Sequence, residues 1–128
     1  ESFNMIMEFT QQHPYYVNAL CDEIWAEHDK TPTEDDVREC WNFIVESDRS
    51  DLVKEFLRLS DNQRKVAIHI ANNGGNDLFA SKSTQAMDIA PGSLHTAVSA
   101  LIEEDVIEKL DDNSYRLVIP VYYEILKM

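Results

Sequence analysis

The sequence predicts a mainly α-helical chain in which a small helical bundle precedes a winged helix-turn-helix with a two-stranded β wing. Apolar residues recur at helical spacing through the first half and again early in the second half. Near the C-terminus, two short runs rich in β-branched residues flank the turn-forming residues 111–113, which is typical of a hairpin. We therefore expect two domains, a bundle over residues 1–59 and a winged helix over residues 60–128.

The first half has the pattern of four short helices. Residues 3–10 suggest the first, and Pro14 suits the first turn of the second. Thr31 and Glu34 fit a capping box for the third, although Thr33 is an equally good cap. A fourth is expected over residues 51–59. The residues expected to face the core are Phe3, Ile6, Met7 and Thr10, then Val17, Leu20, Cys21, Ile24, Trp25 and His28, then Val37, Cys40, Trp41, Ile44 and Val45, and finally Leu52, Val53, Phe56 and Leu57.

The second half begins with another capping-box pattern, in which Ser60 reaches forward and Gln63 reaches back. The helix after this cap ends at the glycine pair of NNGGN. Further helices are expected over residues 83–87 and from Pro91, followed by strands over residues 106–110 and 115–119 and a final helical segment, VYYEILKM. The expected inward residues are Val66, Ala67, Ile70 and Ala71 in one helix and Leu94, Val98, Leu101 and Ile102 in the other.

The chain is strongly acidic, with a formal net charge of -13 over 128 residues. Residues 1–60 hold 14 acidic and 5 basic residues, and residues 61–128 hold 10 and 6, so the halves contribute -9 and -4. This balance opposes binding to nucleic acid and to anionic membranes. No apolar run approaches the ~20 residues that a membrane helix needs, and no signal peptide is visible. We expect a cytoplasmic protein, and we interpret the opening ESFNMIMEF, which lacks an initiator Met, as part of a longer polypeptide.

Residues for catalysis or metal binding do not form a recognisable motif. The phosphate-binding pattern GxxxxGK[ST] is missing, so the segment is not expected to hydrolyse ATP by itself, and we do not expect an enzyme. Neither the histidines nor the two cysteines have metal-ligand spacing, and Cys21 and Cys40 are expected to be buried, reduced thiols, with a disulfide as the alternative. The acidic runs at residues 34–36 and 103–105 are interpreted as solvated charge.

The helix that begins at Pro91 occupies the position of a DNA-reading helix, yet no lysine or arginine occurs from Pro91 to Glu108. Winged-helix proteins that hold DNA use such residues on phosphates. Its expected outward face, which we interpret as a protein-interaction face, consists of Ser93, His95, Thr96, Ser99, Glu103 and Glu104. The alternative, contact with DNA, would have to use Lys82, Lys109 and Arg116.

Five segments, taken in order, resemble a known region. These are TQQHPYYVNALCDEIW, TEDDV, LSDNQRKVAIHIA, APGSLHTAVSALIEEDVI and YRLVIPVYYEIL. Together they resemble the lid and winged helix that follow the nucleotide-binding core in prokaryotic AAA+/STAND-type P-loop ATPases, in particular the archaeal-type ATPases. The resemblance implies that the parent protein binds ATP or ADP with Mg²⁺, and that this region contacts its own ATPase core and other protein domains or subunits.

In that family a turn and its proline lie against the adenine of the nucleotide. The resemblance carries this role to His13, Pro14 and Tyr15. The family usually has glycines where this chain has Gln11 and Gln12, which puts close approach of the backbone to the base in question. The alternative is that Pro14 simply starts a helix and the tyrosines pack against neighbouring helices.

Three functions follow from these observations. The first is a regulatory region of an ATPase, in which the acidic winged helix contacts protein and helps keep the ATPase closed, as the resemblance implies. The second is a DNA-binding region of an ATPase, and the third is a transcriptional regulator. The acidic composition favours the first of these.

Overall fold

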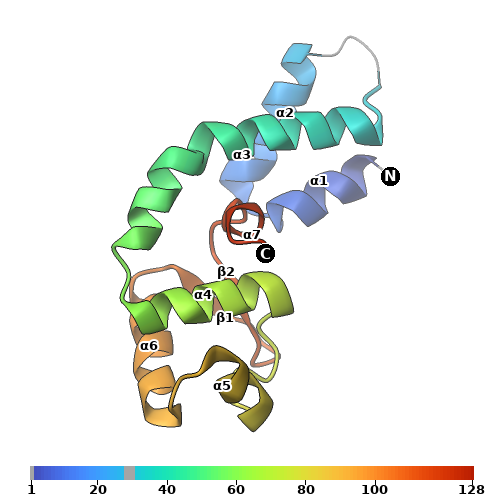
Figure 1. The fold of residues 1–128 in the computed structure, drawn as a ribbon. Helices are drawn as coiled ribbons and strands as arrows, with labels where there is room; N and C mark the ends of the chain where they lie inside the picture. The colour runs from blue at the N-terminus through green and yellow to red at the C-terminus, as the bar shows by residue number, and fades with distance from the viewer. Residues whose placement is uncertain (1, 28–30) are drawn as a thin grey trace. The chain divides into compact units, whose positions relative to one another are not determined.

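The computed structural model describes residues 2–27 and 31–128, and these form seven helices and one two-stranded sheet (Figure 1). The helices are α1 (Ser2–Thr10), α2 (Pro14–Glu27), α3 (Glu34–Leu57), α4 (Asp61–Asn73), α5 (Ser81–Met87), α6 (Pro91–Glu103) and α7 (Tyr122–Ile125), and the strands are β1 (Ile107–Lys109) and β2 (Tyr115–Leu117). Two compact units, Glu1–Asp51 and Leu52–Met128, are each described separately below. The expected domain boundary after Leu59 stays a prediction.

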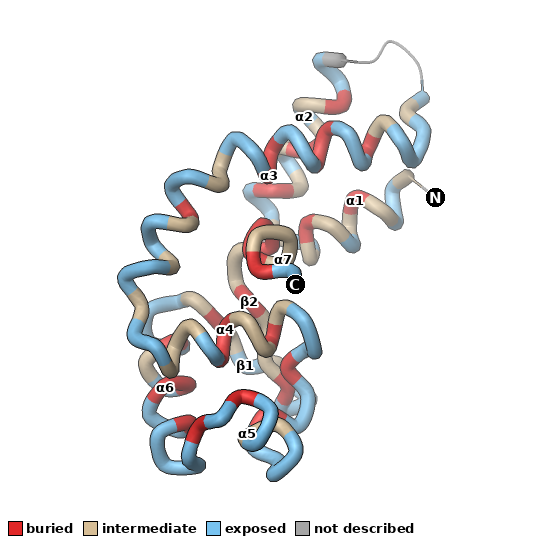
Figure 2. The backbone as a smooth tube through the Cα atoms, viewed as in Figure 1, coloured by how far each residue is buried: buried red, intermediate tan, exposed pale blue. Residues whose placement is uncertain are grey.

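The N-terminal unit buries one side of α1, α2 and the first part of α3. Trp41 lies at its centre and is 1% exposed, with Phe9 stacked on its ring at 5.8 Å and Tyr16 packed edge-on at 6.0 Å. The hydroxyl of Tyr16 donates to the carboxylate of Asp48 at 3.1 Å. Figure 2 shows the buried positions along these helices. The residues of this core are Ile6, Thr10, Tyr16, Leu20, Ile24, Val37, Cys40, Trp41, Ile44 and Val45.

The start of α3 resolves the two capping alternatives in favour of Thr33. The backbone N–H of Asp36 donates to Thr33 Oγ1 at 3.2 Å, and the backbone N–H of Thr33 donates to Asp36 Oδ2 at 2.9 Å. This reciprocal pair satisfies two backbone donors that the first turn of a helix otherwise leaves unpaired. The acidic run at residues 34–36 therefore lies in the first turn of α3, where the helix dipole favours negative charge.

The expected break before residue 51 does not occur, because α3 is one continuous helix of 24 residues. The intervening residues are polar but include neither glycine nor proline, so they interrupt the apolar pattern without interrupting the backbone. Local contacts also support the helix here. Ser47 Oγ donates to the carbonyl of Phe43 at 2.9 Å, and Arg49 pairs with Glu46 one turn earlier at 2.9 Å.

Two expected core residues of the first unit lie at its surface. Trp25 is 78% exposed and Phe3 is 65% exposed. The buried residues of α2 are Tyr16, Leu20 and Ile24, which are four residues apart and therefore lie on one face of the helix. Trp25 is rotated by about 100° from Ile24 around the helix axis and lies outside this face. His28, the last residue of the expected stripe, lies outside the described residues.

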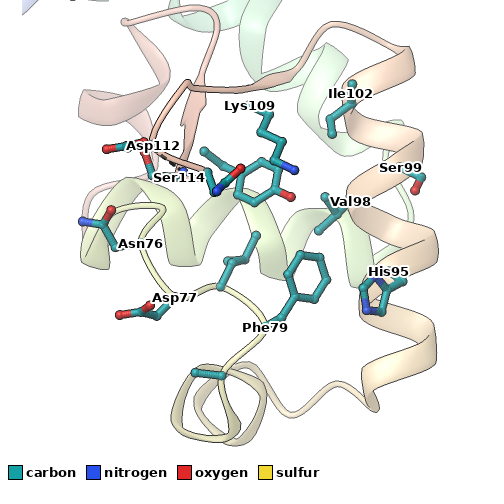
Figure 3. A pocket seen from close by; sticks show the side chains of 14 residues that line it. Asn76, Asp77, Phe79, His95, Val98, Ser99, Ile102, Lys109, Asp112 and Ser114 are labelled. Carbon is teal, nitrogen blue, oxygen red and sulfur yellow. Dashed lines mark hydrogen bonds between the residues drawn. The ribbon is translucent and has the colours of Figure 1, made fainter.

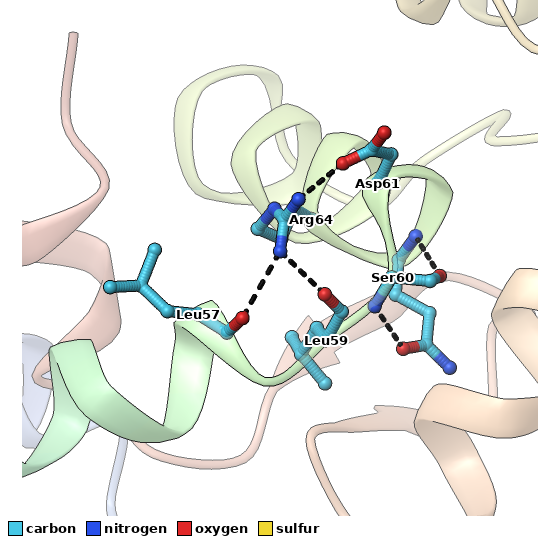
Figure 4. A network of polar contacts seen from close by, with 6 residues as sticks. Leu57, Leu59, Ser60, Asp61 and Arg64 are labelled. Carbon is cyan, nitrogen blue, oxygen red and sulfur yellow. Dashed lines mark hydrogen bonds and ion pairs between the residues drawn. The ribbon is translucent and has the colours of Figure 1, made fainter.

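The C-terminal unit begins with the end of α3 and the capping box of α4, which confirms the Ser60–Gln63 prediction. Gln63 N–H donates to Ser60 Oγ at 3.2 Å, and Ser60 N–H donates to Gln63 Oε1 at 2.8 Å (Figure 4). The guanidinium of Arg64 donates to the carbonyls of Leu57 at 3.2 Å and Leu59 at 2.6 Å, and also pairs with Asp61. A cation thus satisfies carbonyls at the end of α3, where the helix dipole favours positive charge.

Helices α4, α5 and α6 and the β1–β2 hairpin build the core of this unit. The strands are antiparallel, with Ile107 opposite Leu117 and Glu108 opposite Arg116. Both strands are shorter than the sequence suggested, and α5 begins two residues earlier, at Ser81. The expected inward set is confirmed for Leu94, Val98 and Leu101, but Ile102 is 38% exposed, and Ala97 is buried instead. The core-facing stripe of α6 is therefore centred on Leu94, Ala97, Val98 and Leu101.

Close backbone contact holds the loop after α4 against the hairpin. The N–H of Tyr115 donates to the carbonyl of Gly75 at 3.1 Å. A Cβ atom on Gly75 would lie 1.8 Å from the carbonyl oxygen of Tyr115, so this approach requires glycine. The C-terminal segment is fixed by a buried hydrogen bond from the hydroxyl of Tyr122 to the carbonyl of Leu52 at 2.9 Å.

Candidate functional site

The outward face of α6 carries the six residues predicted to form an interaction face, and all six are exposed. They are Ser93, His95, Thr96, Ser99, Glu103 and Glu104. Thr96 Oγ1 donates back to the carbonyl of Gly92 at 3.2 Å. The first half of this face carries Ser93, His95, Thr96 and Ser99, none of which is acidic. Its C-terminal end is acidic, because Glu103 and Glu104 are followed by Asp105. Negative charge at a helix C-terminus is not favoured by the helix dipole, so these residues do not stabilise α6 through the dipole.

The three basic residues considered for DNA do not form a shared basic surface. The Arg116 guanidinium on β2 donates to Glu108 on β1 at 2.5 Å, so its charge is already neutralised across the hairpin. Lys109 also lies on the hairpin, but it lines a groove with two aspartates. Lys82 is an exposed residue in the first turn of α5.

A groove of about 700 Å³ lies where the 76–80 loop, α6 and the hairpin meet (Figure 3). It contains an aromatic cluster. The ring of Phe79 stacks on the imidazole of His95 with 4.2 Å between centroids and 15° between planes, and it meets Tyr115 edge-on at 6.2 Å. The remaining lining residues are Asn76, Asp77, Leu78, Ala80, Val98, Ser99, Ile102, Lys109, Asp112, Asn113 and Ser114.

Sequence reasoning missed this groove, although it identified His95, Ser99 and Lys109 separately. The three contributing segments are separated in the chain and are brought together only by the packing of α4 against α6 and of the loop against Tyr115. The available signal was Leu78–Phe79, two large apolar residues in an otherwise polar loop. Leu78 is 2% exposed and anchors the loop, whereas Phe79 is 36% exposed and faces the groove.

The turn of the hairpin has a fixed geometry on the groove side. The hydroxyl and the backbone N–H of Ser114 donate to Asp112 Oδ1 at 2.5 and 3.0 Å. Because these bonds favour the ionised form, the pKa of the Asp112 carboxyl is lowered from its usual value. Asp112 therefore presents a negative charge at neutral pH.

The turn that the resemblance assigns to the adenine has the backbone of a glycine turn. Gln11 and Gln12 have φ angles of 51° and 59°. The backbone N–H of Gln12 donates to the carbonyl of Met7 at 3.2 Å, and the backbone N–H of Gln11 donates to the carbonyl of Glu8 at 3.3 Å. These two hydrogen bonds form a Schellman motif that ends α1. The two glutamines thus adopt the left-handed conformation that glycine favours, at a cost of about 1–2 kcal/mol per residue.

The three residues assigned to the adenine follow this turn. Pro14 is the first residue of α2, as the sequence indicated, and Tyr15 is 64% exposed. The ring of His13 packs edge-on against Tyr16 at 5.3 Å. The Nδ1 atom of His13 is buried, and none of the described residues forms a hydrogen bond with it.

Within the described residues, the histidines, cysteines and carboxylates do not form a metal site or a disulfide. No cluster of three or more His, Cys, Asp or Glu residues there has metal-binding geometry. Cys40 is buried and Cys21 half-buried, and no disulfide joins them. Burial lowers the pKa of His69 on α4, so this imidazole is neutral at pH 7.

Comparison with known proteins found no matching family model, no matching curated protein and no matching solved structure. Among the described helices, none is both long and apolar enough to cross a membrane.

Proposed function

We propose that this chain is the non-catalytic regulatory region of a larger AAA+/STAND-like ATPase, and that it works through protein contacts made by an acidic winged helix. In this proposal residues 1–59 are the lid and residues 60–128 are the winged-helix domain. The observation that carries the protein-contact role is the exposed face of α6, which has no lysine or arginine and ends in Glu103, Glu104 and Asp105.

The order of elements in the C-terminal unit supports a winged helix. Three helices, α4 to α6, are followed by the antiparallel hairpin, and in this proposal α6, the third of them, corresponds to the helix that DNA-binding winged-helix proteins insert into the major groove. Duplex DNA would meet carboxylates on this helix, and the nearby Arg116 is already paired with Glu108. Phosphate contacts supply most non-specific DNA affinity, so this face favours a protein partner.

The turn after α1 supports the lid assignment. Its backbone at Gln11 and Gln12 lies in the left-handed region that glycine favours, so this chain reaches without glycine a conformation that is open to the glycines of the resembling family. His13 and Tyr15 follow directly and supply one half-buried and one exposed ring. In the intact ATPase these residues would lie beside the adenine.

A charge-reversal experiment tests the choice between protein and DNA. We expect the chain to show no salt-sensitive binding to a random 20-base-pair duplex in fluorescence anisotropy. The Glu103→Lys/Glu104→Lys variant should gain such binding, because each new phosphate contact adds about 0.9 to the slope of log K against log salt. A Ser99→Asn variant, which adds no charge on the same face, is the control. Strong binding by the unmodified chain would favour the DNA-binding alternative.

The ATPase assignment is tested on the intact polypeptide that contains this segment. Its sequence before Glu1 should contain GxxxxGK[ST], and deletion of residues 60–128 should change ATP turnover, with an increase if this region keeps the ATPase closed. Absence of that loop would contradict the ATPase assignment and leave the protein-contact assignment to be judged by the duplex experiment.

A further inference from the structure

The groove between the 76–80 loop, α6 and the hairpin presents apolar side chains that the fold itself leaves uncovered. Phe79 is 36% exposed and Ile102 is 38% exposed, while their neighbours Leu78 and Val98 are 2% and 3% exposed. Figure 3 shows the Phe79 ring and Ile102 bordering the same space. In a concave site, such side chains can pack against one apolar side chain of a partner and remove it from water.

The walls of the groove are already ordered in the chain alone. Phe79 is stacked on His95, the ring of Tyr115 meets Phe79 edge-on, and the Asp112 carboxylate accepts hydrogen bonds from Ser114. A ligand therefore does not have to order these side chains when it binds, which removes one of the main costs of association.

Charge around the groove selects the type of partner. Asp77 and Asp112 lie on the side away from α6 (Figure 3), and Glu103 follows Ile102 on α6. Among the described residues that line the groove, Lys109 is the only lysine or arginine. An anionic ligand would meet one ammonium group and two carboxylates, in a chain whose net charge is -13. A cationic partner is complementary both to the rim and to the chain as a whole.

We propose that this groove binds a short segment of a partner protein in which a bulky apolar side chain lies next to lysine or arginine residues. The apolar side chain packs against Phe79 and Ile102, and the basic side chains pair with Asp77 and Asp112. The aliphatic part of Lys109 contributes to the apolar wall, and its ammonium group limits affinity for a basic segment. This inference rests on the proposed protein-binding function and specifies where and what that function binds.

Selection from a library of random 12-residue peptides displayed on phage tests the proposal. Residues 1–128 are the bait, and the Ile102→Lys variant is the counter-selection bait. We expect enriched peptides that combine Leu, Ile, Phe or Trp with Lys or Arg. Synthetic, fluorescein-labelled copies should bind about tenfold or more weakly to Ile102→Lys, because a large apolar contact is lost. An Ile102→Gln variant removes the apolar contact without adding a charge and should also bind more weakly. Circular dichroism of every variant shows whether the fold is kept, so that a loss of contact can be told from a loss of structure.

Two changes in charge, one change on the outer face of α6 and one control sharpen this test. Asp77→Asn removes a negative charge and introduces a residue type that also tolerates the φ of 53° at this position. This variant should bind the peptides more weakly, and Lys109→Glu should bind them more tightly. An anionic ligand or DNA would respond to Lys109→Glu in the opposite direction. Thr96→Trp, on the exposed face of α6 outside the groove lining, tests for contact through that face, and Gln85→Trp, exposed on α5 and outside both the face and the groove, is the control that should leave binding unchanged.

Enrichment of acidic peptides, no enrichment, or binding that survives Ile102→Lys would each overturn the groove proposal. Peptides that are lost only with Thr96→Trp would overturn it while supporting protein contact through the outer face of α6. Failure of the proposed function itself is distinguishable, because it would appear as salt-sensitive duplex binding by the unmodified chain in the anisotropy experiment.

Discussion

In the unit Leu52–Met128 the buried hydroxyl of Tyr122 donates to a carbonyl, whereas in the unit Glu1–Asp51 the buried indole N–H of Trp41 has no acceptor among the described residues. The Nδ1 atom of His13, in the same N-terminal unit, is also buried without a hydrogen bond from the described residues. Backbone strain does not separate the units, because non-glycine residues with positive φ occur in both: Gln11 and Gln12 in the first, and Asp77, Asp88, Asp105 and Asn113 in the second. Unpaired buried polar groups cost free energy. The two units therefore differ in how well their buried side-chain polar groups are satisfied, and the described part of the C-terminal unit is the better satisfied.

The largest expected effect follows from adding one methyl group to the C-terminal unit. Gly75→Ala places Cβ against the backbone of Tyr115, which cannot move aside as a flexible side chain could. We expect a loss of more than about 3 kcal/mol in the free energy of unfolding, or a hairpin that no longer packs on the loop. Chemical denaturation followed by circular dichroism measures it.

The matched control is Gly92→Ala on α6, where nothing lies within 4 Å of the added atom. It should be neutral or stabilise by up to about 1 kcal/mol, because alanine is the better helix former. Equal effects of the two substitutions would show that the close approach of Gly75 to Tyr115 does not support the fold.

The buried hydroxyl of Tyr122 predicts an effect that depends on pH. Burial and the nearby Glu55 raise the pKa of Tyr122 to about 12 from 10.0. A raised pKa means that the stabilisation is complete below pH 10 and is lost as pH rises towards 12, because the unfolded chain releases the proton first. Tyr122→Phe should cost about 1 kcal/mol at pH 7 and should remove part of the loss above pH 10. Parallel curves for both proteins up to pH 12 would contradict this, and Tyr15→Phe controls for the number of tyrosines.

Local patterns predicted most of the fold, because their causes lie within a few residues. The Ser60–Gln63 capping box, the turn at residues 111–113 and the core positions Leu94, Val98 and Leu101 all depend on neighbours in sequence. The continuity of α3 was missed because polarity was treated as a break, although residues 46–51 contain neither glycine nor proline and polar side chains are compatible with a helix. The groove was missed because Phe79, Ile102 and Tyr115 meet only through tertiary packing.

A smaller effect, of opposite sign, is expected at the turn after α1. Gln11→Gly removes the cost of a left-handed glutamine, and the greater freedom of glycine in the unfolded chain offsets part of this gain. The net result should be a stabilisation of up to about 1 kcal/mol in chemical denaturation. Gln11→Val, which tolerates this backbone poorly, should destabilise. A destabilising Gln11→Gly would show that the glutamine side chain makes contacts that outweigh its backbone strain.

The smallest effect is expected for Trp41→Phe, even though Trp41 is the largest fully buried side chain of the described chain. The substitution loses apolar volume, which by itself costs free energy, but it also removes an indole N–H that has no acceptor among the described residues. An unpaired buried donor costs about 1–3 kcal/mol, so the two effects should nearly cancel and leave a change below about 1 kcal/mol. The fluorescence of the remaining Trp25, which is 78% exposed, provides an independent check that the unit stays folded. A loss above about 3 kcal/mol, as for a well-satisfied core aromatic, would mean that the N–H is paired in solution and that the two units do not differ in this respect.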